Sequence, residues 1–331
     1  YQIPGGRVAS AENIVFTVQR QYSVTSTAGS VVTITTGSGE EFDDEAQWIF
    51  VNTNTGAEEV VAPTAIGVAQ TGAFQTANAT VSGASQNYIV YAYVQKNASA
   101  PKVKSYSRHG LVGAISAARV QDSGGDRFAF DLYDGISVVE ARADSAAGRI
   151  ITDQLTFDGG QRDNYYGPVV LKSDGLPSSV SNVFARFEYF TWGATGDYFS
   201  VNSYFLSDSF QYADIPTYVS DRNGETYDLK NQVDFRPKLD PFENTMTGAD
   251  RFENPRDGDN ITYDVEWYNR RIDHVALGYN PNDFTTEIRV NAGVEELEPS
   301  DPSPKVNEMT LFRVEYGGNT LDVKDLSVNR I

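Results

Sequence analysis

Short runs of β-branched and aromatic residues, separated by clusters of Gly, Ser, Asn and Asp, constrain the fold of this chain most strongly. Residues 13–24 (NIVFTVQRQYSV), 88–95 (YIVYAYVQ) and 182–191 (NVFARFEYFT) are typical of these runs. Runs of this kind between turn-forming residues indicate strands, and many of them at close spacing indicate an all-β fold. We therefore expect a mainly β protein, built as several β-sandwich modules of the immunoglobulin or fibronectin kind in series.

The same pattern recurs along the whole chain. No sustained heptad pattern predicts a coiled-coil shaft, and no apolar run approaches the ~20 residues that a membrane helix needs. Further strands are expected at residues 31–36, 48–52, 111–120, 127–133, 149–157, 169–172, 198–204, 261–268, 272–279, 285–292, 308–316 and 320–328.

A chain of 331 residues is long enough for two or three domains. We expect a β-sandwich domain over residues 1–110, which ends in a connector at 104–110, and a second β domain over residues 111–237. A loop or linker is expected at 238–260, where residues 240–259 are polar and interrupted by proline and glycine. A small β domain is expected over residues 261–331.

The composition excludes several classes of function. The chain carries 45 acidic and 26 basic residues, a net charge of −19, so we expect neither nucleic-acid binding nor membrane insertion. It contains no cysteine, which excludes disulfides, thiol catalysis and zinc–thiolate sites. Because the first residue is Tyr1 rather than Met, the chain is expected to be either processed or a piece of a longer polypeptide.

The sequence offers little to a catalytic site. Its two histidines, His109 and His274, lie in different predicted domains, and we expect His274 in a strand at a domain surface. There is no G-x-S-x-G elbow, P-loop or G-x-G-x-x-G motif. Among 45 acidic residues, the carboxylate pair that a glycosidase needs would arise by chance and is not informative. We expect no enzyme, no catalytic residue and no cofactor.

Three acidic clusters could offer oxygen ligands to calcium. None matches the twelve-residue calcium loop, and Asp–Gly and Asn–Gly pairs are also ordinary turn formers. Turns are therefore the favoured interpretation and no metal site is expected, with calcium as the alternative. The clusters are Asp122–Asp126 (DSGGD), Asp221–Glu225 (DRNGE) and Asp257–Asn260 (DGDN).

Aromatic residues are concentrated in the second predicted domain. Exposed aromatic side chains could bind sugars, whereas buried ones would fill sheet cores or subunit interfaces. We favour cores and interfaces and keep a sugar-binding surface as the alternative. The candidates are Tyr165, Tyr166, Tyr189, Trp192, Tyr198 and Tyr204.

Four long stretches carry a resemblance to a known family. They are residues 155–172 (LTFDGGQRDNYYGPVVLK), 187–204 (FEYFTWGATGDYFSVNSY), 215–237 (IPTYVSDRNGETYDLKNQVDFRP) and 267–277 (WYNRRIDHVAL). In this order they resemble stretches of structural virion proteins of T-even-type myoviruses, especially those that infect cyanobacteria. The resemblance covers about residues 111–331. The chain departs from the family at Asn269 and Arg270, where the family has Leu–Pro, and at 316–320 (YGGNT), where it has a PPYT stretch.

The resemblance implies a structural role without catalysis. The chain would be part of the tail fibre or baseplate of a tailed-phage virion, an extracellular particle. It would assemble as a homo-oligomer, expected to be a trimer, and with other virion structural proteins. A host-surface glycan-binding (adhesion) module and a fibre-associated depolymerase are the alternative functions.

The chemistry of these motifs also favours structure. In VDFRP, Phe235 can anchor a core while Asp234 and Arg236 point to the opposite face, and Pro237 ends the strand. We therefore predict a domain junction here rather than an active site. Short polar side chains beside glycine suit turns, and Asp–Arg pairs can join one turn to the next. The residues concerned are Asp163, Asn164, Asp197, Asp228 and Asp234, beside Arg162 and Arg236.

Overall fold

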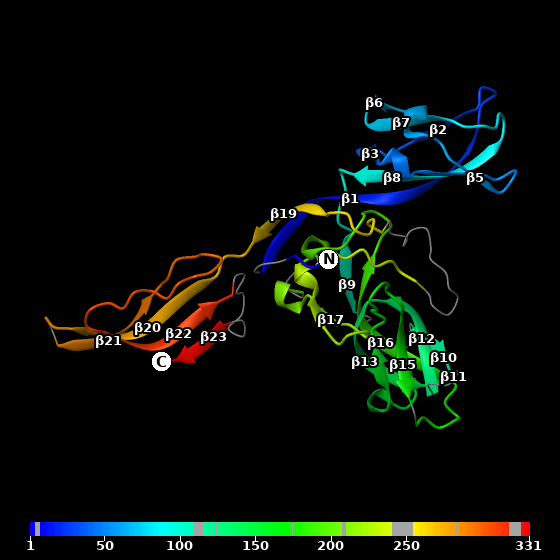
Figure 1. The fold of residues 1–331 in the computed structure, drawn as a ribbon. Coiled ribbons are helices and arrows are strands. Elements are labelled where there is room, and N and C mark those ends of the chain that lie inside the picture. The colour runs from blue at the N-terminus through cyan, green and yellow to red at the C-terminus, as the bar shows by residue number, and fades with distance from the viewer. Residues whose placement is uncertain are drawn as a thin grey trace. The chain divides into compact units, whose positions relative to one another are not determined.

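The structure is a computed structural model that describes residues 1–3, 7–108, 115–122, 125–173, 175–206, 210–239, 254–282, 284–317 and 326–331. Strands dominate these ranges and are gathered into several separate sheets (Figure 1), which confirms the prediction of a mainly β fold. The assignment of the modules to the immunoglobulin or fibronectin kind stays a prediction. No helix within the described ranges is long and apolar enough to cross a membrane.

The described residues form strands and short 3-10 helices. The strands are β1 (Val8–Thr25), β2 (Val31–Thr35), β3 (Glu40–Asp43), β4 (Ile49–Asn52), β5 (Ala57–Glu59), β6 (Ile66–Thr71), β7 (Phe74–Thr80), β8 (Asn87–Lys96), β9 (Lys104–Arg108), β10 (Ile115–Ala118), β11 (Val120–Asp122), β12 (Gly125–Tyr133), β13 (Gly135–Ala143), β14 (Thr156–Asp158), β15 (Pro168–Ser173), β16 (Asn182–Trp192), β17 (Thr217–Val219), β18 (Thr226–Asp228), β19 (Thr262–Trp267), β20 (Arg271–Asn280), β21 (Thr285–Asn291), β22 (Glu308–Tyr316) and β23 (Leu326–Arg330). The 3-10 helices are η1 (Glu45–Gln47), η2 (Pro63–Ala65), η3 (Thr152–Gln154), η4 (Val201–Ser203), η5 (Tyr212–Asp214) and η6 (Leu229–Asn231).

The chain divides into two compact units. The terminal unit combines Tyr1–Ala11, Ser200–Val233 and Val265–Ile331, and the central unit combines Glu12–Phe199 and Asp234–Asp264. Each unit is thus assembled from separated segments, whereas the sequence predicts continuous domain ranges. The chain passes from one unit to the other four times.

Two sheets are built mainly from the first hundred residues. One has the strand order β19-β1-β8-β4-β5, with β3 also paired to β8, and the other has the order β2-β7-β6. Residues alternate between faces along β8, where Tyr88, Val90, Ala92 and Val94 are buried. The antiparallel ladder between β1 and β8 extends from the pair Phe16 and Lys96 to the pair Thr25 and Asn87. It confirms the strands predicted at 13–24 and 88–95.

Two further sheets of the central unit share one apolar core. In one, β16 lies between β10 and β13 and also pairs with β9, and in the other the order is β11-β12-β15-β14 (Figure 1). Both sheets contribute buried side chains to the same cluster, because alternate residues of β12, β15 and β16 point inward. Its buried members include Phe128, Phe130, Ala141, Val169, Leu171, Val183, Ala185 and Phe187.

The terminal unit holds a four-stranded antiparallel sheet and a small hairpin. The sheet has the order β21-β20-β22-β23, and the hairpin pairs β17 with β18. The strands expected at 272–279, 285–292 and 308–316 are therefore confirmed as β20, β21 and β22. Of the strand expected at 320–328, residues 320–325 lie outside the described residues, and β23 begins at Leu326.

Three predictions of local structure are wrong. Residues 149–157 do not form one strand, because η3 interrupts them at Thr152–Gln154, where the Thr152 hydroxyl bonds the backbone of Ala141. Residues 198–204 turn into η4, where the Ser200 hydroxyl accepts a hydrogen bond from the backbone N–H of Asn202. Residues 104–108 are not a connector but strand β9, paired with the end of β16.

The loop predicted at residues 240–259 is described only from residue 254 onward. There the chain is irregular, with an isolated bridge between Pro255 and Val18 and a turn at Gly258. Arg256 holds this segment in place, since its backbone N–H donates to the carbonyl oxygen of Thr17 over 2.7 Å. Its guanidinium also lies 4.1 Å from the ring centroid of Tyr93.

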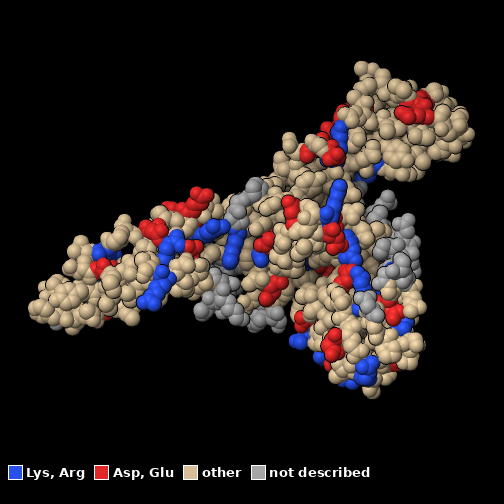
Figure 2. All heavy atoms as spheres, turned by 60° about the horizontal axis from the view of Figure 1, so that its bottom comes forward, with Lys and Arg blue, Asp and Glu red and all other residues tan. Residues whose placement is uncertain are grey.

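Acidic and basic side chains are interspersed on the face of the molecule drawn in Figure 2. Many form ion pairs across neighbouring strands, such as Arg108 with Glu188 over 3.2 Å. Mutual pairing of this kind is consistent with a solvated surface, although the excess of acidic residues remains.

Candidate functional site

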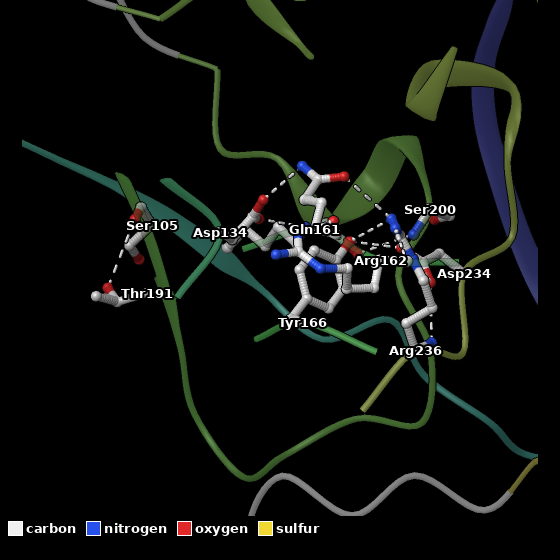
Figure 3. A network of polar contacts seen from close by, with 11 residues as sticks. Ser105, Asp134, Gln161, Arg162, Tyr166, Thr191, Ser200, Asp234 and Arg236 are labelled. Atoms are coloured by element: carbon white, nitrogen blue, oxygen red, sulfur yellow. Dashed lines mark hydrogen bonds and ion pairs between the residues drawn. The ribbon is translucent and has the colours of Figure 1, made fainter. Parts of the chain in front are cut away.

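Five polar side chains from distant parts of the sequence meet inside the central unit (Figure 3). Lys104 begins β9, Asp134 is the single residue between β12 and β13, and Tyr166 precedes β15. Asp234 and Arg236 come from the VDFRP motif. All five are buried, with exposed fractions between 0 and 9%. We call this set the buried polar network.

Lys104 and Asp134 form one half of the buried polar network. The Lys104 Nζ donates to Asp134 Oδ2 over 2.6 Å, and the two side chains are 0% and 1% exposed. The other carboxylate oxygen, Asp134 Oδ1, accepts a hydrogen bond from Gln161 Nε2 over 2.7 Å. Both oxygens of a fully buried carboxylate therefore have donors, as burial of a charge requires.

Asp234 and Arg236 form the other half. Arg236 Nε donates to Asp234 Oδ1 over 3.0 Å and Nη2 to Oδ2 over 2.8 Å, a two-pronged pairing that fixes both side chains. Arg236 Nη1 also donates to the backbone carbonyl of Arg162 over 2.9 Å. The motif at 155–172 and the motif at 215–237, which are far apart in sequence, are thus joined by one guanidinium.

Tyr166 links the two halves and lies between Asp134 and Asp234 in Figure 3. Its hydroxyl accepts from Lys104 Nζ over 3.0 Å and from Arg236 Nη2 over 2.9 Å, and it donates to Asp234 Oδ2 over 2.5 Å. The hydroxyl therefore uses its single proton and both lone pairs. The backbone N–H of Tyr166 also donates to the carbonyl of Pro237 over 2.7 Å.

Aromatic rings enclose the Lys104 ammonium. Its Nζ lies 4.4 Å from the ring centroid of Phe199, 4.5 Å from Tyr166 and 5.6 Å from Trp192. The faces of such rings attract a cation, so they partly replace the water that burial removes. The guanidinium of Arg236 stacks on the Tyr166 ring from a distance of 4.4 Å.

Burial and neighbouring charges shift the ionisation of this network. Burial lowers the pKa of Lys104, and the negative charge of Asp134 only partly opposes that effect. Burial alone would raise the pKa of Asp234, but the adjacent Arg236 guanidinium outweighs it and holds the pKa at about 2. Asp234 and Arg236 are therefore both charged at neutral pH.

The other face of the VDFRP motif is apolar, as predicted from the strand alternation. Phe235 is buried, and its ring centroid lies 4.8 Å from that of Phe16 and 6.2 Å from that of Tyr198. Asp234 and Arg236 point away from it into the buried polar network. The division between the terminal and central units falls between Val233 and Asp234, within this motif.

Arg162 pairs with Asp158, the last residue of β14, which the sequence did not single out. Arg162 Nη2 lies 2.7 Å from Asp158 Oδ2, and Lys172 Nζ lies 2.9 Å from the same oxygen. Burial raises the pKa of Asp158, but these two donors lower it to about 2 overall. Asp163, the next residue along the chain, is exposed.

The remaining motif residues serve as local anchors or turn residues. Asp197 Oδ2 accepts from the backbone N–H of Ala100 over 3.0 Å, and Asp197 also pairs with Lys96. Asp228 begins η6 by accepting from the backbone N–H of Lys230 over 3.2 Å. Asn164 is exposed beside Asp163.

Gly160 positions the turn that carries Gln161, and replacing it with alanine should be costly. Its φ of +84° is strained for any residue with a side chain, and a Cβ would lie 2.1 Å from the carbonyl oxygen of Gly167. We expect Gly160→Ala to lower the free energy of unfolding by about 2–3 kcal/mol. Urea denaturation measures this, with Gly193→Ala as the matched control because nothing lies within 4 Å of its added Cβ. Equal stability of the two variants would contradict a requirement for glycine at 160.

The two histidines do not form part of this site. His109 lies outside the described residues. His274 lies in β20 as predicted, between β21 and β22, but it is buried rather than at a domain surface. Its Nε2 lies 3.0 Å from Asp301 Oδ1, which also accepts from Arg313 Nε over 2.6 Å.

The sugar-binding interpretation of the six aromatic candidates is weakened by their burial. Trp192 and Tyr165 are half-buried, and Trp192 packs on Tyr166 and Phe199. The core interpretation is confirmed for the four buried residues, which are Tyr166, Tyr189, Tyr198 and Tyr204.

The acidic clusters form turns where they are described. At 221–225 the Asn223 side chain donates to Glu225 Oε2 over 2.8 Å, and Gly224 supplies a positive φ. At 257–260 Gly258 does the same and Asp259 pairs with Arg256. Among the described residues, no group of three or more histidine and carboxylate side chains could hold a metal ion. The cluster at 122–126 is only partly described.

A pocket of the terminal unit is lined by four arginines together with Glu298, Glu315 and Tyr316. Acidic neighbours compensate much of its charge. Arg271 Nη1, for example, donates to Glu295 Oε1 over 3.2 Å, and Arg313 pairs with both Asp301 and Glu315. Arg270, one of the departures from the family motif, is exposed at its edge. The arginines are Arg7, Arg270, Arg271 and Arg313.

The buried polar network is thus the most unusual chemical feature of the described residues. It was not predicted from the sequence as a unit, although Asp234, Arg236 and Tyr166 were each singled out. Lys104 and Asp134 were missed, since a lysine in a short polar run and an aspartate before a glycine carry no signal of burial. No protein-family model, curated protein or solved structure matches the chain.

Proposed function

We propose that the chain is a non-catalytic structural component of a tailed-phage virion, in the tail fibre or baseplate. It assembles with copies of itself, as a trimer, and with neighbouring virion proteins. The ordered motifs over residues 155–277 support the family, and the mainly β fold suits a mechanical part. The observation that carries the proposal is that residues of these motifs converge on a buried network instead of an open site.

The burial of Tyr166, Asp234 and Arg236 favours a structural role over catalysis of an external substrate. A catalytic group must come within hydrogen-bond reach of its substrate, and these residues are at most 9% exposed. Their polar atoms are instead engaged with one another. A buried, fully hydrogen-bonded set of charges contributes to conformational specificity, because its hydrogen bonds can form in only one arrangement of the segments that supply it.

The adhesion alternative rests on exposed aromatic side chains, and four of its six candidates are buried. The depolymerase alternative requires an accessible carboxylate pair in a groove. The two carboxylates of the buried polar network, Asp134 and Asp234, are each engaged by cations. Both alternatives therefore have less support than the structural role.

The solution mass of the purified chain tests self-assembly directly. We expect size-exclusion chromatography with light scattering to give three times the mass of one chain, and immunogold particles against the chain to label virion tails in electron micrographs. A monomer at micromolar concentrations, together with unlabelled tails, would refute the proposal. A monomer that binds specific glycans on an array would instead support the adhesion module.

A further inference from the structure

Lys104 and Asp134 are held in direct contact inside a closed, aromatic-lined site. We propose that they condense to form an intramolecular isopeptide bond between Lys104 Nζ and Asp134 Cγ, with the release of one water molecule. The bond would join the first residue of β9 to the turn between β12 and β13. The proposal concerns the chemistry of this chain and does not depend on its place in a virion.

The lysine is suited to act as a nucleophile. An ammonium cannot attack a carbonyl carbon, so the nitrogen must first lose a proton, which a water-poor site favours. Lys104 is completely buried and surrounded by the rings of Phe199, Tyr166 and Trp192. Burial also lowers its pKa, which increases the fraction of neutral amine.

The aspartate is suited to act as the acceptor. When the nitrogen attacks Cγ, negative charge develops on the carboxyl oxygen that does not leave, and a fixed donor at that oxygen stabilises it. Gln161 Nε2 donates to Asp134 Oδ1 over 2.7 Å. Arg236 fixes the orientation of the Gln161 amide, because Arg236 Nη2 donates to Gln161 Oε1 over 3.4 Å.

The remaining oxygen, Asp134 Oδ2, is positioned to leave as water. It lies 2.6 Å from Lys104 Nζ, so it can receive protons from that nitrogen without an intermediary. The first proton converts the ammonium and carboxylate into an amine and a carboxylic acid. The amine lone pair then forms the Nζ–Cγ bond, a second proton passes from Nζ to Oδ2, and the Cγ–Oδ2 bond breaks. The products are one amide and one water, and no oxidant or other reagent is needed.

Tyr166 is a positioning residue for this step. Its hydroxyl accepts a hydrogen bond from Lys104 Nζ over 3.0 Å and is itself anchored by donating to Asp234 Oδ2 over 2.5 Å. This contact holds the nitrogen beside the carboxyl group. Groups fixed in reacting geometry behave as if present at concentrations of about 10⁵–10⁸ M, which offsets the unfavourable condensation of dilute acids and amines in water.

Condensation also simplifies the electrostatics of the site. The buried polar network holds two cations and two carboxylates, and each charge is costly to remove from water. Amide formation eliminates the charges of Lys104 and Asp134 together. It leaves Asp234 and Arg236 as a balanced pair, still joined to each other by two hydrogen bonds.

The intact mass of the full chain, measured in denaturant, tests the proposal without any substitution. We expect the chain to be lighter than its sequence by the mass of one water molecule. Tryptic digestion should then yield residues 103–108 (VKSYSR), uncut after Lys104, joined to residues 128–142 (FAFDLYDGISVVEAR). A chain of full mass that is cut after Lys104 and releases residues 128–142 without a linked peptide would overturn the proposal.

Substitutions assign the bond to its residues. Lys104→Met should restore the full mass of the substituted chain, whereas Asp134→Asn should lose ammonia in place of water. The matched control is Lys172→Met, which removes an exposed lysine paired with Asp158 and should still lose water. Loss of water by Lys104→Met, or its absence in Lys172→Met, would overturn the assignment.

The rate of bond formation tests the role of Tyr166. Full-length chain made by cell-free translation can be quenched in acid denaturant at intervals and weighed. Because misplacement of a reacting group costs on the order of 100-fold in rate, Tyr166→Phe should lose water about 100-fold more slowly than the unsubstituted chain. An unchanged rate would show that Tyr166 does not position Lys104.

Discussion

Replacing Arg236 with leucine is expected to lower the free energy of unfolding by about 3–5 kcal/mol, because it leaves the Asp234 carboxylate buried without its cation. The substitution also removes the donors to the carbonyl of Arg162 and to the hydroxyl of Tyr166. Urea denaturation followed by intrinsic fluorescence measures the change. The matched control is Arg108→Leu, in a pair whose arginine is 60% exposed, for which we expect a loss of no more than about 1 kcal/mol.

The pH dependence of this effect has a definite sign. The pKa of Asp234 is lowered from 3.8 to about 2 in the folded protein, so its contribution to stability is fully present above pH 4 and is lost as the pH falls toward 2. In Arg236→Leu the buried carboxylate prefers to be protonated, and acid no longer penalises the fold through this group. The stability difference between the two proteins should therefore shrink as the pH falls from 4 to 2. A difference that is constant over this range would contradict the assigned pairing.

Truncating Phe187 to alanine is expected to lower the free energy of unfolding by about 3–5 kcal/mol. Phe187 is completely buried in the core shared by two sheets, and its ring lies edge-on to that of Phe130 with centroids 4.8 Å apart. Its removal would leave a cavity between β16 and β12. The same measurement on Phe74→Ala, at a 43% exposed position of β7, should show a loss of no more than about 1 kcal/mol. A loss of similar size in both variants would mean that the shared core is not packed around Phe187.

The strands with the clearest local signals could be predicted from the sequence. β1, β8 and β16 are long runs of branched and aromatic residues, and alternate positions of β8 and β16 are buried. The strands that were missed lack this signal. β6 and β7 consist largely of Ala, Gly, Thr and Gln, and β13 (GISVVEARA) contains no aromatic residue. Their pairing depends on neighbouring strands and not on their own composition.

The buried polar network shows where reasoning from local sequence ends. The alternation of VDFRP correctly placed Phe235 opposite Asp234 and Arg236. Lys104 lies 130 residues before Asp234 in the sequence, and nothing in the sequence indicated that the two residues would be buried in the same site. Lysine is almost never fully buried unless it has a partner, and that partner is visible only once the chain has folded.

The four passages of the chain between its two compact units limit how the protein can be divided. No single cut releases either unit as one continuous polypeptide, since each draws on segments that are separated in sequence. A truncation after residue 110 would keep Lys104 but discard Asp134, and it would also separate β1 from β19. A protease that cuts one exposed loop would, in the same way, leave fragments whose strands are still paired in the same sheets. The fragments should therefore stay associated after the backbone has been cut.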